Sequence, residues 1–189
     1  MTYTEDLDAF RADIAQQRVP LPRGNEDARM VIKGADLEWY TPKGTNPSLL
    51  APVLGGPIKT FELFLQEIPA GGSSDMQQHH HEAVHCVVSG SGYSEIGGER
   101  WEWGAGDFVC VPPMEWHRHY NASPTEPVRM LLVENTRILA ALGLNYRASE
   151  GFVTYEDLVA SGRVPAAPAN DGAGPATDRR STASAENNG

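Results

Sequence analysis

Between residues 60 and 134, short strand-like segments alternate with turns that contain glycine or proline. Short strands with this punctuation are typical of a β-sandwich or β-barrel. The Gly97-Gly98 pair separates two of the segments, as expected for a tight hairpin turn. The sequence therefore predicts a single all-β barrel, and it contains no internal repeat that would indicate a second one. The predicted strands span residues 60–68, 81–89, 93–96, 99–103, 108–111, 116–121 and 128–134.

The barrel occupies only part of the 189-residue chain, whose length suits one domain with tails. An amphipathic helix is expected near the N-terminus, because apolar residues recur there at helical spacing. The C-terminal residues are mainly Ala, Pro, Gly, Asn, Asp and Ser, which leaves little to bury and predicts disorder. The predicted parts are an N-terminal helix (4–17) and extended arm packing on the barrel (1–59), the barrel core (60–135), short helices (137–142 and 155–161, within 136–163) and a disordered tail (164–189).

Net charge and composition exclude several classes of function. The formal net charge is −10, so the surface repels phosphate backbones and no nucleic-acid partner is expected. The N-terminus lacks the basic and apolar regions of a signal peptide, and no apolar stretch is long enough to cross a membrane. We therefore expect a cytoplasmic protein. Its two cysteines, Cys86 and Cys110, are expected to be reduced and buried.

The six histidines are crowded into one part of the chain. All lie between His79 and His119. If His79 and His81 share a strand, they point to the same face, and His80 points to the opposite face, toward packing or solvent. A register shifted by one residue would exchange these roles. The other three histidines are His85, which has the same parity as the first pair, and His117 and His119, which a barrel can bring beside it.

Imidazoles converging from separate strands predict a transition-metal site. Neutral histidines suit iron, copper, zinc or nickel better than magnesium or calcium, which prefer oxygen ligands. The candidate ligands are His79, His81 and His117. Three protein ligands leave coordination positions open for substrate, water or dioxygen, which is typical of a catalytic site.

These histidines stand within two motifs that resemble those of the cupin superfamily. The first motif is a glycine, His-x-His, a glutamate and a second glycine; the second is Gly, Pro-x-Gly, His and Asn. The second motif departs from the family pattern at one glycine, and the first has a longer spacer and lacks the glutamate. The matching positions are Gly72, His79, His81, His85 in the glutamate slot and Gly92, then Gly106, Pro112, Met114 in place of glycine, His117 and Asn121.

A first motif without the glutamate resembles that of the three-histidine branch of the superfamily. This branch includes gentisate-type and diketone-cleaving dioxygenases. The run at residues 106–119, with its Trp-His-x-His ending, is similar to the gentisate type. The resemblance implies a cupin jelly-roll barrel, a homodimer and an iron(II) dioxygenase that uses dioxygen to cleave a C–C bond of a hydroxylated aromatic or enolisable dicarbonyl small molecule. Zinc, manganese, nickel and copper remain alternatives to iron. A non-redox isomerase or lyase and a binding module without turnover remain alternative functions.

Other residues near the motifs allow two readings each. As catalytic candidates, His85 is a fourth metal ligand or another group next to the metal, or else a proton donor behind the ligands or a hydrogen-bonded histidine of the barrel. His119 is a substrate contact or a support for the ligands. Glu82 could act as a base but is expected to be an exposed charge. Three tryptophans, Trp101, Trp103 and Trp116, could line an aromatic pocket, although packing is expected for at least two. Three arginines, Arg100, Arg118 and Arg129, could anchor a carboxylate, although surface solvation is the expectation for each.

Overall fold

The computed structural model describes residues 28–42 and 47–165. The predicted helix at 4–17, part of the arm (residues 18–27 and 43–46) and almost all of the predicted tail lie outside these residues, so the proposed division of the chain stays a prediction. Among the described residues, no helix combines the length and apolar character needed to cross a membrane. The elements are η1 (Gly34–Asp36), β1 (Leu49–Pro52), β2 (Glu62–Ile68), β3 (Gln77–His79), β4 (Ala83–Ser89), β5 (Ser91–Ile96), β6 (Glu99–Gly104), β7 (Phe108–Val111), β8 (His117–Asn121), β9 (Val128–Glu134), α2 (Thr136–Ala141), β10 (Arg147–Ser149) and α3 (Tyr155–Ala160).

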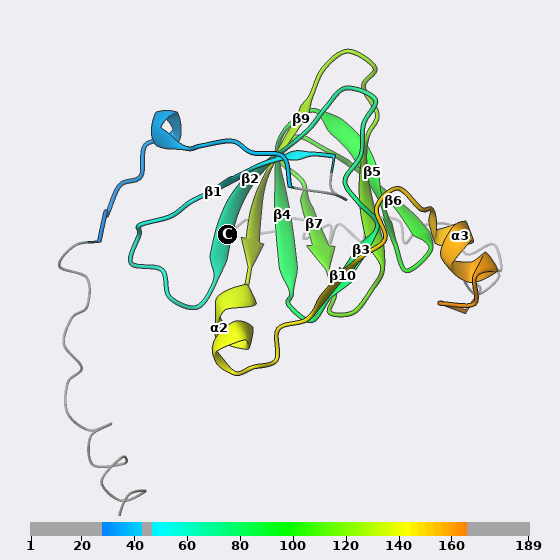
Figure 1. The fold of residues 1–189 in the computed structure, drawn as a ribbon. Helices are drawn as coiled ribbons and strands as arrows, with labels where there is room; N and C mark the ends of the chain where they lie inside the picture. The colour runs from blue at the N-terminus through cyan, green and yellow to red at the C-terminus, as the bar shows by residue number, and fades with distance from the viewer. Residues whose placement is uncertain (1–27, 43–46, 166–189) are drawn as a thin grey trace, which may run out of the picture.

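The strands form two antiparallel five-stranded sheets that face each other as a jelly-roll barrel (Figure 1). The first sheet has the order β1-β2-β9-β4-β7 and the second the order β10-β3-β8-β5-β6. This arrangement confirms the all-β barrel expected from the sequence. The chain crosses from the second sheet to the first between β3 and β4, and this crossing positions the candidate site.

The core has one part between the sheets and another outside them. Alternating residues of facing strands fill the space between the sheets, as pleated strands require. A separate cluster forms where α3 packs beside the second sheet (Figure 1). The inner cluster contains Ile68, Val87, Trp103, Val109, Val128, Met130 and Leu132, and the outer one contains Met76, Trp116, Tyr155 and Leu158.

The cysteines differ from expectation. Both are free, but Cys110 is exposed and Cys86 is only partly buried. Each alternates with buried neighbours along its strand, such as His85 in β4 and Val111 in β7. The prediction of burial was wrong because apolar strand residues occupy the outer face of the first sheet as well as the inner face.

Candidate metal centre

Five of the six histidines are buried where the two sheets meet. They come from β3, β4 and β8 and from the bend between β3 and β4. The sixth, His80, is exposed, and its Nδ1 lies 2.6 Å from the backbone oxygen of Leu144. The expectation that His80 faces away from the others is thus confirmed. The buried five are His79, His81, His85, His117 and His119.

The alternation argument used for the first three of these histidines was wrong. It placed them on one strand, but β3 ends at His79, the chain bends at the next two residues, and His85 lies on β4 in the other sheet. His81 faces inward because of the bend, and its ring stacks on that of His79 with centroids 3.6 Å apart. A crossing between sheets, rather than strand periodicity, gathers these side chains.

Contacts between rings connect the histidines into one cluster. The centroids of His79 and His117 are 4.7 Å apart in an edge-on arrangement. His85 and His119 are 4.5 Å apart across the two sheets, and His117 and His119 are 5.6 Å apart along β8. The predicted convergence of His117 with the first pair therefore occurs in the structure.

Backbone carbonyls fix the tautomers of two of the predicted ligands. The Nδ1 atom of His79 lies 2.7 Å from the carbonyl oxygen of His81, and Nδ1 of His117 lies 2.8 Å from that of Glu115. Because a carbonyl can only accept, each Nδ1 carries the hydrogen, and each Nε2 keeps its lone pair. The buried Nε2 of His117 has no partner among the described residues. Both rings thus present a free lone pair, as a metal ligand must.

A different hydrogen-bond chain assigns the tautomer of His119. The indole Nε1 of Trp103 donates to Ser94 Oγ at 2.8 Å, and Ser94 Oγ lies 2.7 Å from Nδ1 of His119. Among the described residues, this fully buried hydroxyl has no other acceptor for its own hydrogen. Ser94 therefore donates to Nδ1, and Nε2 of His119 carries the hydrogen. That buried Nε2 is also without a partner among the described residues, so His119 presents a donor rather than a lone pair.

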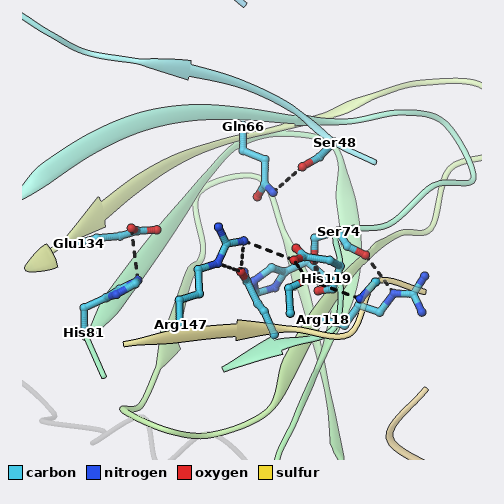
Figure 2. A network of polar contacts seen from close by, with 12 residues as sticks. Ser48, Gln66, Ser74, His81, Arg118, His119, Glu134 and Arg147 are labelled. Carbon is cyan, nitrogen blue, oxygen red and sulfur yellow. Dashed lines mark hydrogen bonds and ion pairs between the residues drawn. The ribbon is translucent and has the colours of Figure 1, made fainter. Parts of the chain in front are cut away.

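His81 contacts a carboxylate at the end of β9. Its Nε2 lies 3.3 Å from Oε2 of Glu134, and its buried Nδ1 has no partner among the described residues (Figure 2). Burial would raise the pKa of Glu134, but the hydrogen bond from His81 and the electrostatic influence of the neighbouring rings outweigh burial and lower it. Glu134 is thus an ionised neighbour of the cluster.

Burial keeps four of the imidazoles neutral. It lowers the pKa of His79 to about 4, with a contribution from His81, and it lowers the pKa of His85 to about 3. The pKa values of His117 and His119 also fall well below the ordinary range, mainly through burial and then through each ring's histidine neighbours. Neutral imidazoles are the form that binds a metal ion.

The donor set fits a transition metal, although the third ring needs to move. With a metal–nitrogen distance of about 2.1 Å, two imidazoles on one ion have centroids roughly 4.6–5.3 Å apart. The separation of His79 and His117 meets this condition, whereas the stacked His79–His81 pair is too close. Among the described residues, no three His, Cys, Asp or Glu side chains are already arranged around a common point. His81 would have to rotate off His79 to share an ion with it.

Met114 occupies the position where the second motif has a glycine. Its φ is +63°, in the left-handed region that favours glycine. Its N–H donates to the carbonyl oxygen of His79 at 2.7 Å. The turn therefore keeps the conformation of the motif, and it supports the end of β3 at the site.

The arginines named from the sequence lie away from the cluster. Arg100 and Arg129 are exposed and pair with Glu102 and Glu67. Arg118 is buried rather than solvated, and it donates to Ser73 and to backbone oxygens of Ser74, Phe152 and Val153. It thus fastens the segment before α3 to the second sheet.

Tryptophan packing follows the expectation. Trp103 and Trp116 are buried in the two apolar clusters, and Trp101 is 47% exposed. Trp101 and Trp103 also line an open groove of about 850 Å³ between β6 and β7, which none of the five buried histidines lines.

Glu82 is exposed, as expected, and its carboxylate accepts a hydrogen bond from Asn135.

Sequence reasoning missed two charged residues beside the cluster. Asp75 is fully buried just before β3, and Arg147 lies on β10, directly opposite His79. Because β10 has only three residues and lies far along the chain, no local pattern predicts that it pairs with β3. Alternation of residues 75, 77 and 79 would have indicated their common face if β3 had been recognised.

Comparisons with known proteins agree with this fold. A family model described as a cupin domain matches residues 64–134. The chain is 26% identical over 140 residues to 1-hydroxy-2-naphthoate 1,2-dioxygenase of Nocardioides sp. (strain KP7), a match that covers 73% of this chain and 36% of the relative. It is 40% identical over 60 residues to gentisate 1,2-dioxygenase 1 of Aquipseudomonas alcaligenes, covering 31% and 17%. The matches thus span about a third of the first relative's length and less of the second's.

Solved structures give the same picture of the fold. A cupin-2 domain protein from Rhodospirillum rubrum has a TM-score of 0.52 and 21% identity, over 74% of this chain and 89% of that one. Salicylate 1,2-dioxygenase from Pseudoaminobacter salicylatoxidans, in its gentisate adducts, has a TM-score of 0.51 and 17% identity, over 76% and 36%. At these identities the likeness establishes the architecture of the barrel.

Proposed function

Because residues 64–134 form a cupin domain related to those of gentisate-type dioxygenases, we propose that this chain is an iron(II)-dependent dioxygenase. Its substrate is a hydroxylated aromatic or enolisable dicarbonyl small molecule, of which it cleaves a C–C bond. The observation that carries the proposal is the cluster of buried, neutral imidazoles gathered from separate strands at the sheet crossing. The names of the two curated relatives, both dioxygenases of hydroxylated aromatic acids, support the reaction class.

In this proposal, His79, His81 and His117 hold the metal. The two rings whose Nδ1 atoms are fixed by carbonyls offer Nε2 lone pairs. His81 offers Nδ1 while Glu134 holds its Nε2, a carboxylate–imidazole link of the kind that orients metal ligands. Iron(II), when bound, would supply the dioxygen chemistry that amino-acid side chains lack.

His119 and His85 are the proposed catalytic residues. The Nε2–H of His119 is positioned by Ser94 to donate to an oxygen of the substrate, which would satisfy a donor that has no partner among the described residues. His85 approaches from the opposite sheet, and its buried Nδ1 has no partner among the described residues. It can donate a hydrogen bond from its ring N–H to a group behind the ligands, or serve as a fourth ligand. The buried apolar cluster between the sheets would help to exclude water from the site.

Oxygen uptake tests the proposal. Metal-free protein is loaded anaerobically with iron(II), mixed with catechol, gentisate or acetylacetone, and exposed to air. We expect oxygen consumption with at least one substrate, its loss in His117→Ala and its retention in the matched control His80→Gln. The absence of oxygen uptake with all three substrates would refute the dioxygenase. Turnover with zinc that needs no oxygen would instead support an isomerase or lyase.

A homodimer in the cytoplasm belongs to the same proposal. Its support is the family resemblance and the expected packing of residues 1–59 on a barrel. Light scattering of the purified chain at the column exit tests the dimer, and a monomeric mass across the micromolar range would contradict it.

A further inference from the structure

Arg147 projects toward the same side of the second sheet as His79. Strand β10 pairs with β3 in the antiparallel sense, and Arg147 lies directly opposite His79 in the register. Residues paired in this way have side chains on the same face, with Cα atoms about 4.5–5.5 Å apart. Figure 2 shows the guanidinium on the inner side of β10, between the His81–Glu134 pair and His119.

Neighbouring groups hold one edge of the guanidinium and leave the other free. Nε of Arg147 donates to Oε1 of Gln77 at 2.9 Å, and Nη2 donates to Oε1 of Gln77 and to Oδ2 of Asp75. Asp75 is fully buried and also accepts from Ser149. Among the described residues, Nη1 has no partner, and the side chain is 46% exposed. The cation is therefore oriented by Gln77 and Asp75 and remains partly exposed to solvent.

We infer that Arg147 binds the carboxylate of an acidic substrate while the neighbouring hydroxyl or carbonyl oxygen reaches the imidazoles. This inference rests on the proposed function and narrows its substrates to acids. A guanidinium edge with free N–H groups matches a carboxylate, and charge-assisted bonds of this kind are strong. The register opposite His79 places the two binding points on the same face of the second sheet, so one small molecule that carries both groups could contact them together.

A purely structural role for Arg147 predicts a different outcome. The β10–β3 ladder and the bond from Ser149 to Asp75 already connect these strands. If Arg147 only fastened β10, its removal would lower stability and affect all substrates alike. As a substrate anchor, it affects only substrates that bear a carboxylate.

The test compares gentisate with catechol, which lacks the carboxylate, in Arg147→Gln. We expect KM for gentisate to rise about tenfold to hundredfold, the range of a lost hydrogen bond between charged groups. KM for catechol should change less than about threefold. The matched control is Arg129→Gln, which removes an exposed, ion-paired arginine elsewhere on the barrel and should change neither KM. Equal effects on both substrates, or no effect on gentisate, would overturn the inference.

A binding measurement separates this inference from the dioxygenase proposal. Salicylate and phenol are titrated into the metal-free chain by calorimetry, with Arg147→Lys as a variant that keeps the pairing charge for Asp75. The wild-type protein should bind salicylate more tightly than phenol, and the lysine variant should lose most of this preference because it lacks the planar fork. A preference unchanged in Arg147→Lys would refute the carboxylate fork, even if no substrate supports oxygen uptake.

Discussion

Acid should unfold the metal-free protein because its buried imidazoles are neutral in the folded state. The pKa of His79 is lowered from 6.5 to about 4 and that of His85 to about 3. Below pH 6.5 the unfolded chain therefore binds protons that the folded chain refuses, so the free energy of unfolding falls as pH falls. Above pH 6.5 both states are neutral, and the stability is fully present.

The size of the loss follows from these pKa values. Each group costs about 1.4 kcal/mol per pH unit below 6.5, so at pH 5 each contributes a loss of about 2 kcal/mol. His79 and His85 together account for roughly 4 kcal/mol, a large part of the 5–15 kcal/mol typical of a domain. His117 and His119, whose pKa values are also lowered, act in the same direction. Glu134 adds its loss only at lower pH, as pH falls below the ordinary pKa of a glutamate and through the lowered value.

Urea denaturation of chelator-treated protein at pH 8 and pH 5 measures this loss. Replacement of one buried ring, in His85→Gln, should remove about 2 kcal/mol of the difference between the two pH values. The matched control His80→Gln, at an exposed position, should leave the difference unchanged. Equal stability of the wild-type protein at the two pH values would refute the argument that burial keeps these rings neutral.

Three further substitutions test individual features of the barrel. Met114→Gly should raise the free energy of unfolding, measured by denaturation, by about 0.5–1 kcal/mol, because glycine adopts a φ of +63° without the strain that a side chain causes there. A lower stability would show that the Met114 side chain stabilises the fold by more than this strain costs. Ser94→Ala should convert His119 from one tautomer to a mixture in ¹⁵N NMR spectra, whereas an unchanged pattern would contradict the assigned hydrogen-bond chain. Gly92→Ala should destabilise the fold by about 3 kcal/mol, measured by urea titration, because a Cβ would lie 2.0 Å from the backbone oxygen of Tyr120; wild-type stability would contradict that close approach.

The sequence predicts strands well where turn residues clearly bound an apolar run, and poorly elsewhere. β7 and β9 begin and end as predicted, because glycine, proline or charged residues bound their apolar runs. β1, β3 and β10 were missed because they show little apolar alternation. Their positions depend on pairing with partners far along the chain, as in the pairing of β10 with β3.

Prediction of the site also succeeded where local patterns suffice and failed where tertiary contacts decide. Motif spacing identified the histidines that gather in the barrel, and His117 lies beside His79 as expected. Local patterns could not indicate that the chain changes sheets after His79, so the predicted common strand was wrong. Asp75 and Arg147 stand in no motif, and only the tertiary register brings them to the cluster. The chemistry of the ligands was thus accessible from sequence, whereas their surroundings were not.

Trp103 belongs both to the apolar cluster and, through Ser94, to the hydrogen-bond chain that ends at His119. Its indole N–H is therefore polarised by whatever His119 contacts on its far side. The molecule thus carries an intrinsic optical reporter that is connected to its own site and needs no label. The emission of Trp103, separated from that of the other three tryptophans by comparison with a Trp103→Phe variant, would therefore respond to occupancy of the site.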